Sequence, residues 1–381
     1  PILPMQTTSS YIMSKSWAEA NGAVKPASVK NKVENFATNN ADGTGPFKIS
    51  SRQVGVKTIL VPNEAWWGPK EHNLTEVAFT PIQSDATRVA ALLSGELDMV
   101  YPIPQQDVAR VNATGKHSVL TGFELRTMFL NMDQKRDELL ESNVKGKNPF
   151  KDKRVRQAFY QAIDIVGIQK TVMRGASRPT ALMVGPGVNG WNAEQDKRLP
   201  YDVEAAKKLL ADAGYPNGFE VTLNCPNDRY VNDGQICQSV AANLAKIGVK
   251  IDLATETKGT YFPKILRRDT SFYLLGWTPT TYDAHNALTS LMACPDDKGT
   301  GQFNLGAYCN PKLDVLINKI QSETDKPKRD AMIKEAFAIH SDDIGHLPLH
   351  QQSLAWGVSK KVELTQLADN FMFYKWMSIK P

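Results

Sequence analysis

The sequence lacks three features that would assign it to common classes of protein. No stretch approaches the run of about 20 apolar residues that a membrane-spanning helix requires. The charge is nearly balanced, with 45 basic and 40 acidic residues, and the basic runs are interrupted by acidic or apolar residues, so we expect no nucleic-acid partner. No basic segment followed by an apolar core opens the chain at Pro1, so a signal peptide has been removed or the chain has been cut elsewhere.

The local motifs of catalysis are also missing. The chain contains no Gly-x-Ser-x-Gly, no His-Glu-x-x-His and no P-loop. His346 and His350 have a metal-ligand spacing, but Pro348 between them excludes a regular helix, and a surface or hinge role is favoured. We therefore expect no catalytic residue, no metal and no cofactor. A hydrolase would need a nucleophile and a base that converge from separate elements, and it remains the alternative from a different class.

Cysteine is scarce, with four residues in 381. They form two groups that are close in sequence, Cys225 with Cys237 and Cys294 with Cys309, and neither group has the spacing of a zinc site. Disulfides Cys225–Cys237 and Cys294–Cys309 would indicate an oxidising compartment. The alternative is four buried free thiols.

The apolar pattern predicts an α/β fold. Apolar residues alternate over 219–223 and 249–253, and those between 236 and 247 repeat at helical spacing, which predicts a strand–helix–strand unit with parallel strands. Other segments predict strands over 47–49, 57–61, 97–101, 123–131, 271–276 and 347–358, and helices from Asp85 as cap, from Arg154, over 203–213 and through Met332, Ala336 and Ile339. We expect mixed sheets in at least two lobes.

Large aromatic side chains are frequent near the predicted loops. Flat amphipathic rings offer a large contact area to small ligands at a low entropy cost, although core packing is the alternative and is preferred for Trp66 and Trp67. The aromatic residues in question are Trp66, Trp67, Trp191, Trp277, Tyr282 and Trp356. Trp277 ends a buried strand, where ligands of α/β proteins bind, so we predict that it lines a cleft between lobes.

Six groups of segments, in the same order, resemble motifs of the family 5 extracellular solute-binding proteins, the peptide-type receptors of ABC importers. They are Gly-Thr-Gly-Pro-Phe-Lys at 43–48 with Asn-x-x-Trp-Trp-Gly at 63–68, Asp-Ala-Thr-Arg at 85–88 with Leu-Ser-Gly-Glu-Leu-Asp at 93–98, Phe-Lys-Asp-Lys-Arg-Val-Arg-Gln-Ala at 150–158, Leu-Ala-Asp-Ala-Gly at 210–214, Gly-Trp at 276–277 with Asn304 and Tyr308, and Leu-Pro-Leu at 347–349. Together they extend over nearly the whole chain.

The resemblance implies a two-lobed periplasmic-binding-protein fold that closes around its ligand at hinge strands near 125–131 and 346–352. Lobe I would comprise residues 1–124 with 353–381, and lobe II residues 125–352. Such a receptor works as a monomer in the periplasm of a Gram-negative bacterium and delivers its solute to the permease of an ABC transporter. In the family the Gly-Thr-Gly-Pro turn lies well inside the protein, so its position at 43 implies that part of lobe I is absent here.

The resemblance also suggests ligand-binding residues. Peptide binders hold the ligand's α-amine with an Asp three residues after the Trp of Gly-Trp, where this chain has Thr280, so an ordinary free-amine dipeptide is not expected. Asp283 matches a more general family Asp that caps a helix from Ala284. Arg229 is placed as the dipeptide binders place an Arg for the ligand's carboxylate, with a surface Arg as the alternative. The full set is Arg229, Trp277, Thr280, Tyr282, Asp283 and Asn304.

The expected ligand is therefore an organic solute with an apolar portion and a carboxylate, foremost an oligopeptide or modified peptide. A metal chelate or haem is the alternative within the same family.

Overall fold

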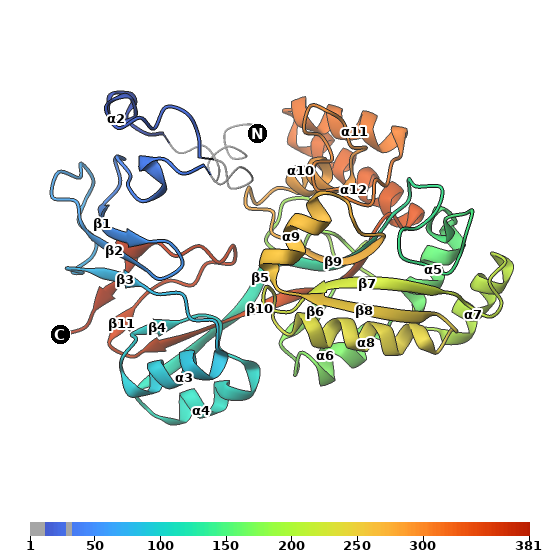
Figure 1. The fold of residues 1–381 in the computed structure, drawn as a ribbon, viewed down its shortest axis with the longest axis horizontal. Helices are drawn as coiled ribbons and strands as arrows, with labels where there is room; N and C mark the ends of the chain where they lie inside the picture. Colours follow the sequence, from blue (N-terminus) through green and yellow to red (C-terminus); the bar gives the residue numbers. More distant parts are fainter. Residues whose placement is uncertain (1–11, 28–32) are drawn as a thin grey trace. The chain divides into compact units, whose positions relative to one another are not determined.

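The computed structural model describes residues 12–27 and 33–381, which form two compact units (Figure 1). The larger unit contains residues 122–354, and the smaller unit contains the described residues before 122 together with 355–381. Two long strands, β5 (His117–Met132) and β10 (Leu347–Ser359), contribute residues to both units. The strands expected near these positions are therefore present, and the chain passes between the units within them.

The main sheet has the strand order β4-β10-β5-β9-β7-β8, with β6 paired to β10. Strand β9 (Phe272–Trp277) runs antiparallel to β5 and parallel to β7 (Glu220–Pro226), which is also parallel to β8 (Lys250–Glu256). Helix α8 (Asp233–Ala245) connects β7 to β8, so the predicted strand–helix–strand unit is confirmed. Both α8 and α9 (Lys258–Leu266) pack against β7 and β8, on opposite sides of the pair (Figure 1).

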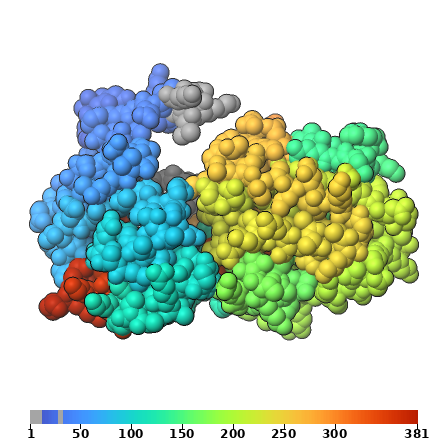
Figure 2. All heavy atoms as spheres, turned by 60° about the horizontal axis from the view of Figure 1, so that its bottom comes forward, coloured from blue at the N-terminus to red at the C-terminus, as the bar shows by residue number. Residues whose placement is uncertain are grey.

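The other elements of the larger unit are mostly helices. They are η3 (Pro149–Lys151), α5 (Lys153–Ala162), α6 (Ile165–Thr171), β6 (Ser177–Pro179), α7 (Val203–Asp212), α10 (Ala284–Ala287), η4 (Leu288–Met292), α11 (Pro311–Ser322) and α12 (Lys326–Asp343). Residues around 250, coloured yellow, form a continuous part of the face shown in Figure 2. The predicted α/β class with mixed sheets is confirmed.

Four phenylalanines form the centre of the larger unit's core. Five of the six pairs of rings have centroids 5.4–6.2 Å apart, and each side chain is at most 5% exposed. They come from four elements or loops: Phe150, Phe159, Phe219 and Phe272. Burying a Phe side chain stabilises the fold by about 1.5–3 kcal/mol, so this cluster fixes α5 against the sheet.

Two helix predictions need correction in detail. Ser84, not Asp85, caps α3 (Asp85–Ser94), because its side chain accepts a hydrogen bond from the Thr87 amide. In α12 the buried face contains Ile333, Ala336, Phe337 and His340, whereas Met332 and Ile339 are only partly buried. The predicted buried face, through residues 332, 336 and 339, is therefore displaced by about one residue from the face that α12 buries.

The smaller unit combines two small sheets with short helices. Its elements are α2 (Lys15–Ala20), η1 (Phe36–Thr38), β1 (Phe47–Gln53), β2 (Lys57–Pro62), β3 (Val77–Phe79), α3, β4 (Met99–Val100), η2 (Gln105–Asp107), α4 (Val108–Ala113), β11 (Val362–Glu363), η5 (Tyr374–Trp376) and β12 (Ser378–Ile379). Core packing is wrong for Trp67, which is 82% exposed. Among the described helices, none has both the length and the apolar character needed to cross a membrane.

Both expected disulfides are present. Cys225, near the end of β7, is bonded to Cys237 of α8, and Cys294 is bonded to Cys309, just before α11. The alternative of free thiols is excluded. The first bond fixes α8 to its strand, and the second closes the loop 294–309.

Candidate functional site

Trp277 is held at the carboxyl end of β9. Strand pairing places it opposite Thr127 of β5. Its indole Nε1 donates a hydrogen bond to Oδ1 of Asn286 at 2.8 Å, and its ring centroid lies 4.9 Å from that of Phe303. The ring is partly exposed, so it offers an oriented aromatic surface at the edge of the larger unit.

The loop after Trp277 is fixed at its far end by Asp283. Both carboxylate oxygens accept hydrogen bonds from Arg329 of α12 at 2.7 Å, and Oδ1 also accepts one from the His285 amide, so the predicted helix cap is confirmed. Although burial alone would raise the pKa of Asp283, the Arg329 guanidinium keeps that pKa below its usual value. The carboxylate is fully engaged and positions the loop.

Between these two anchors the loop exposes Thr280 and Tyr282. Tyr282 is 40% exposed and has a φ of 55°, a left-handed conformation that is uncommon for an aromatic residue. Its backbone is held at both sides, because its amide donates to the Pro279 carbonyl and its carbonyl accepts from the Asn189 amide, both at 2.9 Å. Thr280 is partly exposed, and its hydroxyl forms no hydrogen bond with another described residue.

A second part of the site follows β7. Arg229 is exposed, and its guanidinium carbon lies 4.9 Å from the centroid of the Tyr230 ring. Arg126 of β5 lies 5.6 Å from the same centroid. Arg229 forms no ion pair within the described part of the chain, whereas Arg126 pairs with Glu124 at 2.9 Å. The loop therefore presents a guanidinium that no carboxylate of the described residues pairs with.

Tyr230 joins the two parts of the site. Its hydroxyl accepts a hydrogen bond from the Gly276 amide at 3.1 Å, and a Cβ at position 276 would come within 2.9 Å of the tyrosine ring. Only glycine therefore leaves room for this ring beside β9. Burial raises the pKa of Tyr230, with a smaller opposing effect from Arg229 and Arg126, so the phenol stays neutral.

A buried polar network holds the loop that carries Arg229 and Tyr230. The Glu124 side chain is fully buried and accepts hydrogen bonds from Arg126 and from Nε2 of Gln352, the latter at 2.8 Å. Oε1 of Gln352 accepts the Val231 amide at 3.0 Å. The network thus links β5 and β10 to the loop that carries Arg229 and Tyr230. Sequence reasoning missed these residues, although Glu124 and Arg126, two apart in an apolar strand, were a usable signal.

Asn304 lies in the loop 294–309 and is fully buried. Its amide donates to the carbonyls of Ala293 and Tyr308 at 2.9 and 2.7 Å, and its Oδ1 accepts the Tyr308 amide. Its polar atoms are therefore engaged by the loop itself. The structure brings Trp277, Thr280 and Tyr282 together on one loop and places Arg229 on a second. Asn304 instead stabilises the loop 294–309, which carries Phe303.

Possible metal ligands do not converge at this site. Among the described residues the one group with suitable geometry is Cys294, Cys309 and Asp314, and its two sulfurs are bonded to each other. His346 and His350 are at most 2% exposed, so of the expected surface or hinge role the surface part is wrong for both. Nε2 of His340 lies 2.8 Å from Nδ1 of His346, and burial lowers the pKa of His340 to about 4.

Comparison with known proteins identifies the class. A family model described as bacterial extracellular solute-binding proteins, family 5 Middle, matches residues 4–299, and the chain belongs to this family. Family members are binding proteins of ABC transporters rather than enzymes.

The chain is 27% identical over 316 residues to Heme-binding protein A of Haemophilus influenzae, covering 81% of this chain and 54% of that protein. It is 24% identical over 325 residues to the glutathione-binding protein GsiB of Escherichia coli K12, covering 84% and 60%. The chain therefore spans about half to three fifths of the length of these curated relatives.

Solved structures share the fold. The periplasmic binding protein DppA of Helicobacter pylori, in complex with the peptide STSA, matches with a TM-score of 0.82 at 24% identity, over 97% of this chain and 68% of that one. AgaA of Agrobacterium tumefaciens, in complex with agropinic acid, matches with a TM-score of 0.78 at 23% identity, over 96% and 70%. The expected two-lobed binding-protein fold is thus confirmed.

Proposed function

We propose that this chain forms the ligand-binding part of a receptor that delivers a peptide or related organic solute with a carboxylate to the permease of an ABC importer. One observation carries the proposal. The described site combines aromatic surfaces with an exposed, uncompensated Arg229, while its one carboxylate on the ligand loop, Asp283, is neutralised by Arg329. Such a site favours an anionic group on the ligand.

We further propose lobes made of residues 1–124 with 353–381 and of residues 125–352. Segments 1–11 and 28–32 of the first lobe lie outside the described residues. The passage of the chain through β5 and β10 supports their role as hinge strands, and the two disulfides support an oxidising compartment, the periplasm of a Gram-negative bacterium. We expect a monomer without a cofactor.

In this proposal Arg229 binds the ligand's carboxylate, and Trp277 and Tyr282 contact its apolar portion. Thr280 leaves the loop without the anion that would hold a free amine. Asp283 and Asn304 act indirectly by shaping the loops that carry these contacts. Relatives described as binding glutathione, the peptide STSA and agropinic acid support a small carboxylate-bearing solute.

The test begins with native mass spectrometry of the purified protein, which gives the mass of any co-purified solute. Calorimetry then compares the wild type with Arg229→Gln. The matched control is Arg267→Gln, because Arg267 is also exposed but is paired with Asp269. We expect about tenfold to hundredfold weaker binding for Arg229→Gln alone, since hydrogen bonds to charged groups contribute about 1.5–3 kcal/mol. Amidating the ligand's carboxyl group should remove this difference. Equal weakening of acid and amide would contradict the role of Arg229.

Haem is the second candidate, because Heme-binding protein A is among the relatives. All six histidines of the chain are at most 7% exposed, so the described residues offer no accessible imidazole as an axial ligand. A haemin titration followed by absorbance would separate the two candidates. A saturable band shift at one equivalent would favour haem over a peptide.

A further inference from the structure

A pocket lies in the larger unit, at the opposite end of the β5–β9 pair from Trp277. Trp277 is paired with Thr127, whereas Phe272 at the start of β9 is paired with Met132, directly before the pocket residue Asp133. Five residue steps at about 3.4 Å separate the two ends by roughly 17 Å. The pocket has a volume of about 360 Å³, within the range of small-molecule sites.

The acidic residues of this pocket are neutralised by neighbours. The Asp133 side chain is 4% exposed, forms an ion pair with Arg136 at 2.5 Å, and accepts the amides of Lys135 and Arg136 at 3.0 Å. Asp137 pairs with Lys151 at 2.6 Å. Neither carboxylate therefore compensates the remaining cations of the pocket.

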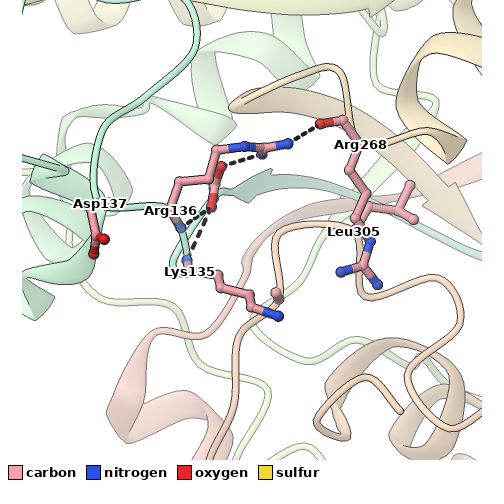
Figure 3. A pocket seen from close by; sticks show the side chains of 7 residues that line it. Lys135, Arg136, Asp137, Arg268 and Leu305 are labelled. Atoms are coloured by element: carbon pink, nitrogen blue, oxygen red, sulfur yellow. Dashed lines mark hydrogen bonds and ion pairs between the residues drawn. The ribbon is translucent and has the colours of Figure 1, made fainter. Parts of the chain in front are cut away.

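Lys135 and Arg268 are those remaining cations. Figure 3 shows the Lys135 ammonium and the Arg268 guanidinium pointing into the same space. Neither forms an ion pair within the described ranges 12–27 and 33–381, and the nearby Asp269 pairs instead with Arg267 at 2.8 Å. Two cations that face one space without a counter-ion repel each other, and an anion between them removes that repulsion.

The backbone holds Arg268 in place. It follows the last turn of α9 with a φ of 61°, a left-handed position where glycine is the usual residue at a helix end. Its amide donates to the Ile265 carbonyl at 2.8 Å, and its carbonyl accepts a hydrogen bond from Arg136 at 2.5 Å. An Arg in a conformation that favours glycine is consistent with a role for its guanidinium.

We propose that this pocket binds a small organic anion with a phosphate or carboxylate group. The anionic group lies between Lys135 and Arg268, and the organic part contacts Leu305 and Ala307, which line the same pocket. Arg supplies a fork of donors and Lys a point charge, a combination suited to an oxygen-rich anion. The site is separate from the solute site of the proposed function and does not depend on it.

The probes are inorganic phosphate, glycerol 3-phosphate and succinate, titrated at constant ionic strength and followed by calorimetry. We expect saturable binding by at least one probe, and about tenfold or greater weakening for Lys135→Gln and for Arg268→Gln. Arg267→Gln and Lys145→Gln, which remove paired surface cations next to this region, should leave the affinity unchanged. Arg229→Gln should also leave it unchanged, which separates this site from the solute site.

The variant Arg268→Gly separates a loss of anion binding from a loss of stability. Glycine favours the left-handed backbone, so this variant should unfold at the same or a higher temperature while losing the anion-dependent shift in unfolding temperature. Equal anion binding by the wild type and the double variant Lys135→Gln/Arg268→Gln would overturn the proposal. Binding to phosphatidylglycerol vesicles without binding of any soluble probe would also overturn it and assign the pocket to a lipid headgroup.

Discussion

The ion pair Asp283–Arg329 allows a quantitative test of how the loop 278–283 is held in place. Its side chains are 25% and 11% exposed, and both hydrogen bonds measure 2.7 Å. Removing one partner of a buried ion pair costs about 3–5 kcal/mol, and partial exposure lowers this cost. Asn preserves the helix cap that Asp283 provides. We therefore expect Asp283→Asn to lower the free energy of unfolding by about 2–3 kcal/mol.

Urea unfolding followed by circular dichroism measures this loss. Arg329→Gln and the double variant complete a mutant cycle, and we expect a coupling energy of at least about 1 kcal/mol. The matched control is Lys334→Gln. Lys334 lies on the same helix as Arg329 and forms an exposed ion pair with Glu194, so its replacement should not shift the midpoint. Because the folded pKa of Asp283 is lowered, the ion pair's contribution is complete well above pH 3.9 and disappears as the pH falls through the folded pKa. A midpoint for Asp283→Asn equal to that of the Lys334→Gln control would refute the reasoning.

Three further predictions concern the same unit. Thr280→Asp should improve binding of free-amine peptides about tenfold to hundredfold and weaken the native solute, and unchanged calorimetric affinities for both would place Thr280 outside the site. Cys294→Ser/Cys309→Ser should lower the free energy of unfolding by about 2–4 kcal/mol in urea, because the bond closes a loop 15 residues long, whereas an unchanged midpoint would contradict this. Burial lowers the folded pKa of His340 to about 4 and that of His350 to about 3. The contribution of the neutral imidazoles to the free energy of unfolding should therefore be complete above pH 6.5 and fall by roughly 2 kcal/mol per group by pH 5. The urea midpoint measured against pH tests this, and a flat profile would show that neither imidazole is held neutral.

Local patterns were sufficient to predict much of the fold from the sequence. Alternation and helical spacing correctly gave the unit β7–α8–β8, because each element there buries a single continuous face. Cysteine spacing gave both disulfides. The neighbouring pair Trp66–Trp67 was misleading, since a tryptophan's size favours burial on average but does not determine it for Trp67.

The site was predictable only in part, since its geometry depends on contacts between distant segments. Gly276 and Tyr230 are 46 residues apart, and Tyr230 reaches the strand only because β9 lies beside β7. Likewise, Asp283 is a helix cap by local pattern, but its neutralisation by Arg329 requires the packing of α12 against the loop. Sequence spacing carries no information about such distant partners, which explains why Arg329 was missed.

In the proposed function, the selectivity of the site depends on the signs of its charges. Asp283 is engaged by Arg329, Glu124 is engaged by Arg126 and Gln352, and the position that would hold an amine carries the neutral Thr280. Arg229 is then the charge in the described site without a partner, so a ligand cation gains no counter-ion while a ligand carboxylate does. In the proposed function, selection against free amines rests on neutralising the carboxylates as much as on presenting Arg229, because a specific site must disfavour the wrong ligand as well as bind the right one.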